Sequence, residues 1–149
     1  MDSIVEIWEQ LAVKYGSRIA LKDETTGYSL SFFELNEKIN KVTQILENLY
    51  IKENSTLLLC LNPHPLWHVI DQAVMKSNCV SASCDSSLGY SEIKYFINTM
   101  DIKVLFTDNI NLINNIIQDN FSIHVFYIDK FNTMKSEKHR ESNVYDIRE

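Results

Sequence analysis

His64 and His68 stand four residues apart, a spacing that places two imidazoles on one face of a helix and could suit a zinc ion. Pro65, however, favours the first position of a helix, so His64 would precede the helix that carries His68. A structural zinc site takes about four ligands, and no third ligand stands near the pair. We therefore predict no metal-binding residue here.

The cysteines Cys60, Cys79 and Cys84 occur in apolar or small-residue settings. Cys79 and Cys84 are separated by an odd interval, which directs two side chains to opposite faces of a strand, so a disulfide between them is not favoured. An odd number of cysteines in such settings indicates reduced thiols in a cytoplasmic protein.

The sequence also lacks the spacings typical of nucleophilic catalysis and phosphate binding. An activated serine often stands in a G-x-S-x-G turn, and no such run occurs. A phosphate loop needs clustered glycines so that backbone N–H groups can approach the phosphates, whereas this chain has 3 isolated glycines. Asp101, Asp108 and Asp129 stand at expected strand or helix ends, where capping is the simpler role. We predict no catalytic and no cofactor-binding residue.

The composition is that of an ordinary folded protein. Hydrophobic residues make up 45% and charged residues 23% of the 149 residues, enough for one sizeable core. The net charge of −6 disfavours nucleic acids and anionic membranes as partners, because both need a basic face. We find no apolar run long enough to span a membrane and no signal peptide, and we expect a cytoplasmic location.

The hydrophobic pattern alternates between strand and helix periods. Strands are expected at residues 18–22, 28–32, 56–61, 79–82, 103–107 and 123–128. Helices are expected from Ser3 to Gly16, from Ser31 to about Leu49, from Pro65 to about Val74, and after caps at Ser91 and at Asp108 or Asn109.

Local signals support the first two helices. Ser3 and Ser31 are each followed three residues later by a glutamate, the pattern of a capping box. Gly16 stands where a left-handed helix end is expected. Residues 23–27 would form a hairpin loop between the first two strands.

Strands that alternate with helices in this way form βαβ units. We therefore predict an α/β fold with a mostly parallel sheet flanked by helices. The nearly continuous apolar run at residues 56–61 is typical of a strand covered on both faces. Residues 1–129 would form one α/β subdomain, and the polar, charged residues 130–149 a linker or tail.

Residues 30–35, Leu-Ser-Phe-Phe-Glu-Leu, resemble the first core motif of the adenylate-forming enzymes, L-(S/T)-Y-x-E-L. Further stretches resemble that family in the same order, at residues 8–21, 35–40, 62–67, 75–85 and 103–108. The most similar members are adenylation domains of nonribosomal peptide synthetases and the related acyl-CoA and acyl-carrier-protein ligases. Six matches in one order at the right spacing make the resemblance specific.

This resemblance implies the N-terminal subdomain of an enzyme that activates a carboxylic or amino acid with ATP and Mg²⁺ for thioester formation. The matched motifs are mainly structural in the family. Its phosphate loop, its ribose-binding aspartate and its lid with the catalytic lysine are absent from these residues, so we expect no cofactor site and no catalysis by this chain alone. The resemblance leaves the substrate acid open.

The second core motif departs from the family pattern in this chain. Asn78 replaces a glycine, and asparagine tolerates a left-handed backbone. Ser83 and Ser86 replace prolines, which would loosen two rigid turns.

Three interpretations stay open at this point. The chain could be the N-terminal portion of a larger adenylating enzyme, or a truncated, non-catalytic docking module of a biosynthetic assembly line. The third is an unrelated nucleotide-binding α/β domain. Expected partners are the remainder of an adenylation domain, an assembly-line protein, or a second copy bound through an exposed apolar face.

Overall fold

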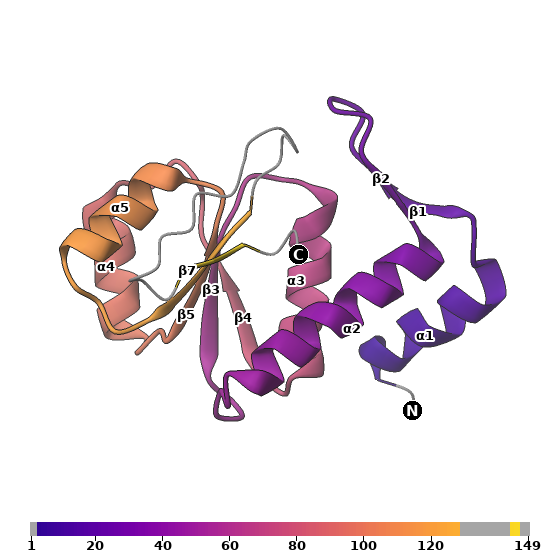
Figure 1. Cartoon of the computed structure of the whole chain (residues 1–149), viewed down its shortest axis with the longest axis horizontal. Helices are drawn as coiled ribbons and strands as arrows, with labels where there is room; N and C mark the ends of the chain where they lie inside the picture. The colour runs from indigo at the N-terminus through magenta and orange to yellow at the C-terminus, as the bar shows by residue number, and fades with distance from the viewer. Residues whose placement is uncertain (1–2, 129–143, 147–149) are drawn as a thin grey trace. The chain divides into compact units, whose positions relative to one another are not determined.

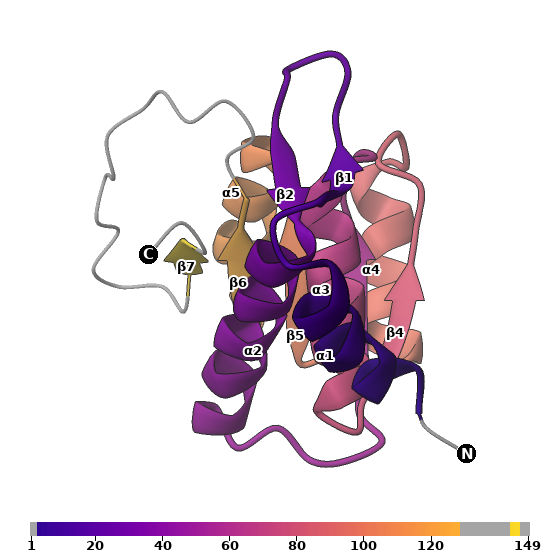
Figure 2. The ribbon, with the colours of Figure 1, turned by 90° about the vertical axis from the view of Figure 1, so that its right-hand side faces the viewer.

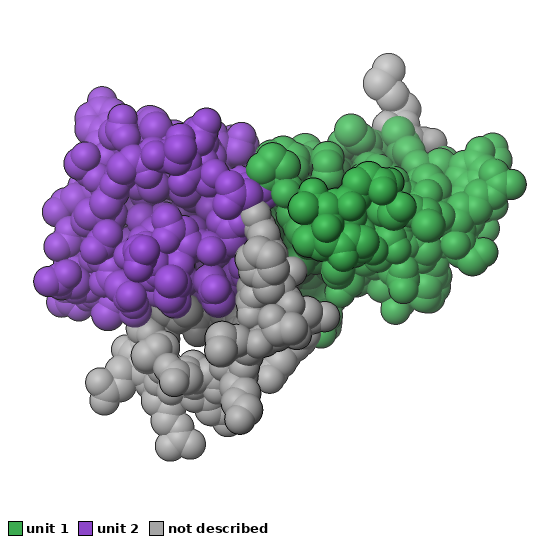
Figure 3. All heavy atoms as spheres, turned by 90° about the horizontal axis from the view of Figure 1, so that it is seen from above, with its two compact units in different colours: residues 1–54, 63–79 green, residues 55–62, 80–149 purple. Residues whose placement is uncertain are grey.

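The computed structural model describes residues 3–128 and 144–146 of the chain (Figure 1). The chain divides into two compact units, coloured separately in Figure 3. Unit 1 comprises residues 1–54 and 63–79, and unit 2 comprises residues 55–62 and 80–149. The chain thus enters unit 2 at residue 55, returns to unit 1 for residues 63–79 and then completes unit 2.

The described elements of unit 1 are α1 (Ile4–Tyr15), β1 (Ile19–Lys22), β2 (Ser29–Ser31), α2 (Phe32–Asn48) and α3 (Pro65–Lys76). Helix α2 packs against both α1 and α3 (Figure 2). It buries one stripe of residues at helical spacing, namely Leu35, Ile39, Val42, Thr43 and Leu46. None of the described helices is long and apolar enough to cross a membrane.

Polar side chains join the three helices of unit 1. Nε1 of Trp8 on α1 donates to Oε1 of the buried Gln72 on α3, at 2.7 Å. Nζ of Lys76 on α3 contacts Oε1 of Glu9 at 2.6 Å and Oδ1 of Asn40 at 2.7 Å. Hence one lysine links α3 to both α1 and α2.

Both predicted capping boxes are confirmed. The hydroxyl of Ser31 accepts the N–H of Glu34 at 3.1 Å, and the Glu34 carboxylate accepts the N–H of Ser31 at 2.8 Å. Ser3 and Glu6 make the same reciprocal pair. Gly16 ends α1 with a positive φ of 34°, but its ψ of −93° lies outside the left-handed helical region that the sequence suggested.

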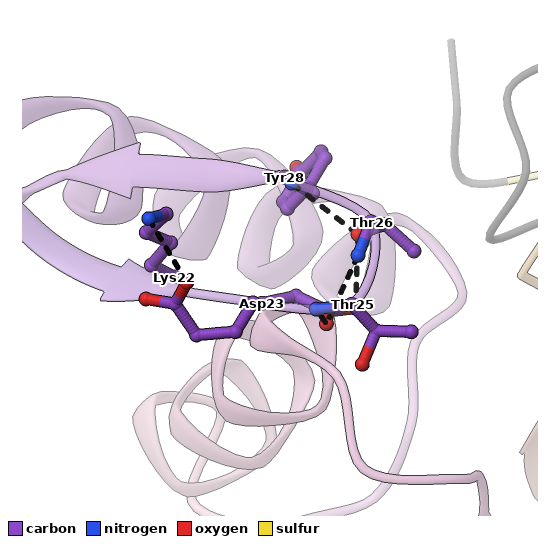
Figure 4. Close-up of polar contacts among 6 residues, drawn as sticks. Lys22, Asp23, Thr25, Thr26 and Tyr28 are labelled. Atoms are coloured by element: carbon purple, nitrogen blue, oxygen red, sulfur yellow. Dashed lines mark hydrogen bonds and ion pairs between the residues drawn. The ribbon is translucent and has the colours of Figure 1, made fainter.

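The predicted hairpin loop is confirmed, and it is organised by one carboxylate (Figure 4). Asp23 accepts the N–H of Thr25 at 2.8 Å and the hydroxyl of Thr26 at 2.9 Å. The Thr26 hydroxyl in turn accepts the N–H of Tyr28 at 3.2 Å. Gly27 takes a φ of 76°, which a residue with a Cβ rarely adopts.

The described elements of unit 2 are β3 (Thr56–Cys60), β4 (Val80–Ser83), α4 (Tyr90–Thr99), β5 (Val104–Thr107), α5 (Ile110–Gln118), β6 (His124–Tyr127) and β7 (Val144–Asp146). The strands form a sheet in the order β4-β3-β5-β6-β7, and every neighbouring pair is parallel. The predicted α/β fold with a parallel sheet is thereby confirmed.

Helices α4 and α5 lie on the same side of this sheet (Figure 1). The core between these two helices and the sheet contains Leu58, Cys60, Leu105, Val125, Ile93, Ile97, Leu112, Ile113 and Ile116. Alternate strand residues point to the opposite face, and Leu57, Leu59, Phe106 and Phe126 are buried there as well. The rings of Phe106 and Phe126 stack with their centroids 4.9 Å apart.

The start of α4 differs from the prediction. The helix begins at Tyr90, so the prediction that Ser91 caps it is wrong. The Glu92 carboxylate accepts the N–H of Gly89 at 2.8 Å and satisfies a donor at the helix start that no capping hydroxyl serves. Glu92, three residues after Gly89, therefore sets the start of α4.

The sequence left Asp108 or Asn109 as the cap of α5, and the structure selects Asn109. Its Oδ1 accepts the N–H groups of Asn111 at 3.0 Å and Leu112 at 3.3 Å. Asp108 is therefore available for another role.

Part of the segment predicted as a charged linker or tail is ordered into the sheet. Val144–Asp146 forms β7 and pairs with β6. Residues 129–143 and 147–149 lie outside the described part of the chain, so the predicted boundary near residue 129 stays a prediction.

Candidate functional site

The order of the strands marks where unit 2 would hold a ligand. From β3 the chain continues to β4 on one side and then to β5 on the other side of β3. In parallel sheets, ligands bind outside the carboxyl ends of the strands at the point where this order reverses. Here that point lies just beyond Cys60 and Thr107, the last residues of β3 and β5.

Three side chains that follow three neighbouring strands are joined by hydrogen bonds at this edge. Asn62 follows β3, and its backbone N–H and its Nδ2 both donate to Oδ2 of Asp108, at 3.2 and 3.1 Å. Ser86, which follows β4, donates from Oγ to Oδ1 of Asn62 at 2.6 Å. This Asn62–Ser86–Asp108 network connects the loops after β4, β3 and β5.

The network borders an open hollow of about 450 Å³. Its lining residues are Asn62, Ser86, Ser87, Asp108, Asn109 and Ile110. Two serines and two asparagines supply hydroxyl and amide groups, Ile110 supplies an apolar side chain, and Asp108 supplies the charged group among these residues.

A second carboxylate lies beside this edge, at Asp85. Its Oδ1 accepts the N–H of Ser87 at 2.8 Å and the hydroxyl of Ser87 at 2.7 Å. These two hydrogen bonds hold the pKa of Asp85 below its ordinary value. The edge consequently carries negative charge at neutral pH.

This hollow does not fit the phosphates of a nucleotide. Phosphate binding relies on lysine, arginine or free backbone N–H groups, and the residues lining the hollow include no lysine or arginine. Two of the first N–H groups of α5, those of Asn111 and Leu112, already donate to the side chain of Asn109. The arrangement can hold three loops in a set geometry through hydrogen bonds, but it cannot neutralise a triphosphate.

The two histidines of the predicted helix start have structural contacts in unit 1. Nδ1 of His64 accepts the N–H of Leu66 at 3.1 Å, so His64 caps α3. The His68 ring meets the Trp67 ring edge-on at 5.3 Å. In the ranges 3–128 and 144–146, no group of three or more His, Cys, Asp or Glu residues is arranged to hold a metal ion.

Two of the departures from the family motif can now be placed. Asn78 has a φ of 56°, which confirms that an asparagine serves the left-handed position there. Ser86, interpreted from the sequence as a loosened turn, makes the 2.6 Å hydrogen bond to Asn62. The network was not predicted because its members are distant along the chain. Asn62 and Asp108 directly follow predicted strands, whereas Ser86 stands four residues beyond the end of one.

Comparison with known proteins agrees with this architecture. The family of AMP-binding enzymes matches residues 8–147. A long-chain-fatty-acid–acyl-carrier-protein ligase of Arabidopsis thaliana, AEE15, a chloroplastic protein, is 25% identical over 116 residues, which are 76% of this chain and 16% of that protein.

Two solved structures show the same fold. A benzoate CoA ligase from Burkholderia xenovorans superposes with a TM-score of 0.75 at 15% identity, over 85% of this chain and 26% of the ligase. The N-terminal subdomain of Klebsiella oxytoca NpsA, solved with 3-hydroxybenzoyl-AMSN, gives a TM-score of 0.68 at 16% identity, over 84% of this chain and 30% of that one.

The chain belongs to the family of AMP-binding enzymes, as the motifs in its sequence indicated. It spans less than a third of the length of each of these relatives. Its described part has the fold of the N-terminal subdomain of adenylate-forming enzymes.

Proposed function

We propose that this chain is the N-terminal scaffold of an adenylate-forming ligase, which uses ATP to convert a carboxylic or amino acid to an acyl-adenylate before thioester formation. The observation that carries this proposal is the family match over residues 8–147, which includes all the strands from β1 to β7. In this proposal the residues that hold ATP, Mg²⁺ and the acid lie outside residues 1–149. An assembly line for nonribosomal peptides or polyketides is the setting that the sequence motifs favour.

The chemistry of unit 2 supports a scaffolding role. The hollow at the carboxyl edge of the sheet is lined by neutral polar side chains, Ile110 and Asp108, and the 3 glycines of the chain are isolated from one another. Transfer of an adenylyl group depends on positioning and on neutralisation of phosphate charge. We therefore expect these residues to shape a neighbouring catalytic centre without forming one.

Calorimetric titration of the chain with Mg-ATP, together with an ATP–pyrophosphate exchange assay over aryl, fatty and amino acids, tests this proposal. We expect no saturable heat of ATP binding and no ATP–pyrophosphate exchange by the chain. The Burkholderia benzoate CoA ligase serves as the positive control for the assay with benzoate. Stoichiometric ATP binding by the chain would overturn the scaffold proposal and favour an independent nucleotide-binding domain. The coding sequence after Glu149 is a second test, since continuation into a Ser/Thr/Gly-rich loop supports the proposal.

A second candidate function is a non-catalytic docking module, and the exposed apolar side chains of α1 favour it. Ile4 and Ile7, one turn apart on the same side of the helix, are 56% and 40% exposed. Exposed apolar groups that form a stripe are typical of an interface. In this alternative the stripe binds an assembly-line protein or a second copy of the chain.

Light scattering on a concentration series, with and without Ile4→Ser/Ile7→Ser, tests the docking alternative. Self-association that the double variant abolishes would support it. Val13→Ser is the matched control, because Val13 is 89% exposed on the opposite side of α1. If the chain is monomeric at all concentrations, binding of a second copy through Ile4 and Ile7 is excluded.

A further inference from the structure

Cys60 and Cys84 lie side by side at the carboxyl ends of two neighbouring strands. Strands β3 and β4 are parallel, and their register runs to the pair Leu59 and Ser83. The N–H of Cys84 donates to the carbonyl of Leu59 at 3.0 Å, so the ladder continues one residue further. Cys60 and Cys84 therefore occupy opposing positions on the same face of the sheet.

Opposing positions on paired strands suit a disulfide. Neighbouring strands are about 4.7–4.9 Å apart, and disulfides join residues whose Cα atoms are about 4.4–6.8 Å apart. The thiols of Cys60 and Cys84 also lie close enough for each to shift the pKa of the other. Both side chains pack in the same core, beneath α4 and α5. The two sulfur atoms are thus held together by the fold, before any oxidation.

The two thiols differ in access and in acidity. Cys60 is 1% exposed, whereas Cys84 is only partly buried. The thiolate of Cys84 can accept a hydrogen bond from Cys60, which lowers the pKa of Cys84. The same hydrogen bond, together with burial and the nearby carboxylates of Asp108 and Asp85, raises the pKa of Cys60. Cys84 is therefore the thiol that an oxidant would meet first.

Cys79, the remaining cysteine, has different surroundings. It is 8% exposed, and its Sγ contacts two backbone carbonyls, that of Ser77 at 3.5 Å and that of Lys52 at 3.7 Å. These carbonyl oxygens are acceptors for the thiol hydrogen of Cys79. Cys79 thus provides a control within the same molecule.

We propose that Cys60 and Cys84 form a reversible dithiol–disulfide pair that glutathione disulfide oxidises. The thiolate of Cys84 attacks one sulfur of glutathione disulfide, which releases one glutathione thiolate and leaves a mixed disulfide on Cys84. Cys60 then loses its proton and attacks Sγ of Cys84, and this forms the Cys60–Cys84 bond and releases the second glutathione. Two cysteine thiols are oxidised, and one glutathione disulfide is reduced to two thiols.

The disulfide would act on the candidate site, because both cysteines lie next to its loops. Cys60 precedes Asn62 by two residues, and Cys84 precedes Ser86 by the same interval. A covalent bond between them would tie the loop after β3 to the loop after β4, which are now joined by the Ser86–Asn62 hydrogen bond. In a reducing compartment, such as the cytoplasm that the sequence predicts, the pair would rest as thiols and respond to oxidation.

The test uses the full chain with Cys79→Ser, equilibrated with mixtures of reduced and oxidised glutathione and quenched with acid. Intact mass and peptide mapping then measure the product. We expect a species lighter by two hydrogen atoms, with Cys60 and Cys84 in one cross-linked peptide, and its restoration by excess reduced glutathione. The equilibrium constant for disulfide formation should be about tenfold larger or more in buffer than in urea, because the fold holds the two sulfur atoms together.

The outcomes distinguish a thiol pair that the fold holds together from nonspecific reaction of the individual thiols. Cys84→Ser should abolish the lighter species while the chain stays folded by circular dichroism, and the wild-type chain should leave Cys79 unmodified. Accumulation of glutathionylated Cys84 with no internal disulfide would overturn the proposal. So would an equilibrium constant that is equal in buffer and in urea, since the fold would then contribute nothing to the pairing.

Discussion

Units 1 and 2 bury their residues in different ways. In unit 2, residues 57–60 of β3 and 104–107 of β5 each expose 1% or less of their surface. In unit 1, α2 buries one stripe of side chains, and α1 has a single buried residue, Ala12, which is 8% exposed. A strand buried on both faces has room for polar chemistry only where it ends. For this reason the Asn62–Ser86–Asp108 network and the Cys60–Cys84 pair both lie at the carboxyl edge of the sheet in unit 2.

The largest effect should come from truncating neighbouring residues of β5. Leu105→Ala should lower the free energy of unfolding by about 2–5 kcal/mol and Phe106→Ala by about 3–5 kcal/mol, because the two side chains fill opposite faces. On α2, Leu46→Ala should cost about 2–5 kcal/mol while its neighbour Glu47→Ala stays within about 0.5 kcal/mol. Urea unfolding followed by circular dichroism measures all four values.

The contrast between neighbouring positions is the decisive measurement. A small cost for either Leu105→Ala or Phe106→Ala would mean that one face of β5 is poorly packed. That result would contradict the proposal that the strands of unit 2 are buried on both faces and the helices of unit 1 on one.

A smaller effect should come from the polar link between α1 and α3. Gln72→Met keeps the length of the side chain but removes the acceptor of the Trp8 N–H. We expect a loss of about 1 kcal/mol in the free energy of unfolding, because a partly buried donor is left without its partner. Gln72→Met made in a Trp8→Phe background should lower the free energy of unfolding by less, since no indole N–H donor remains. A double-mutant cycle measures this coupling, and equal costs in both backgrounds would show that the hydrogen bond is not what joins the helices.

Asn78 offers a test of backbone conformation at the last turn of unit 1. Because its φ is 56°, Asn78→Ala should cost about 1 kcal/mol, whereas Asn78→Gly should stay close to the wild-type free energy of unfolding. Thermal and urea unfolding of both variants provide the comparison. An alanine variant as stable as the glycine variant would contradict the left-handed assignment.

Much of the fold was predictable because its signals are local. Ser31 and Glu34 indicate the start of α2, Pro65 indicates the start of α3, and the apolar run at residues 56–61 indicates a central strand. The error at Ser91 arose where two signals compete. A serine suits a cap in isolation, but the carboxylate of Glu92 reaches back to Gly89 and starts the helix earlier.

The candidate site was predictable only in part, because its contacts are long-range. The sequence places Asn62 and Asp108 after strands, but it does not reveal that β3 and β5 are neighbours, which the hydrogen bonds between these residues require. The same holds for the thiols. Spacing along the chain draws attention to Cys79 and Cys84, while the parallel pairing of β3 and β4 brings Cys84 to Cys60 instead.

The smallest effect concerns two matched carboxylates, Asp23 in the hairpin of unit 1 and Asp85 at the sheet edge of unit 2. Each accepts a backbone N–H from the second residue ahead and a hydroxyl, from Thr26 and Ser87 respectively. These hydrogen bonds lower the pKa of both carboxyl groups below their ordinary value.

A carboxyl group whose pKa is lowered by folding stabilises the fold above its unfolded pKa, and this contribution is lost as the pH falls through the folded pKa. The chain should therefore lose stability below about pH 4. Thr26→Ala should raise the pKa of Asp23 alone, and Ser87→Ala that of Asp85 alone, as carboxyl NMR titrations can measure. Since both groups are exposed, the effect on stability should be smaller than that of the core, hydrogen-bond and backbone substitutions above. Equal pKa values in the wild-type chain and the matched alanine variant would show that the hydroxyl contributes nothing, and that the backbone N–H groups alone hold each turn.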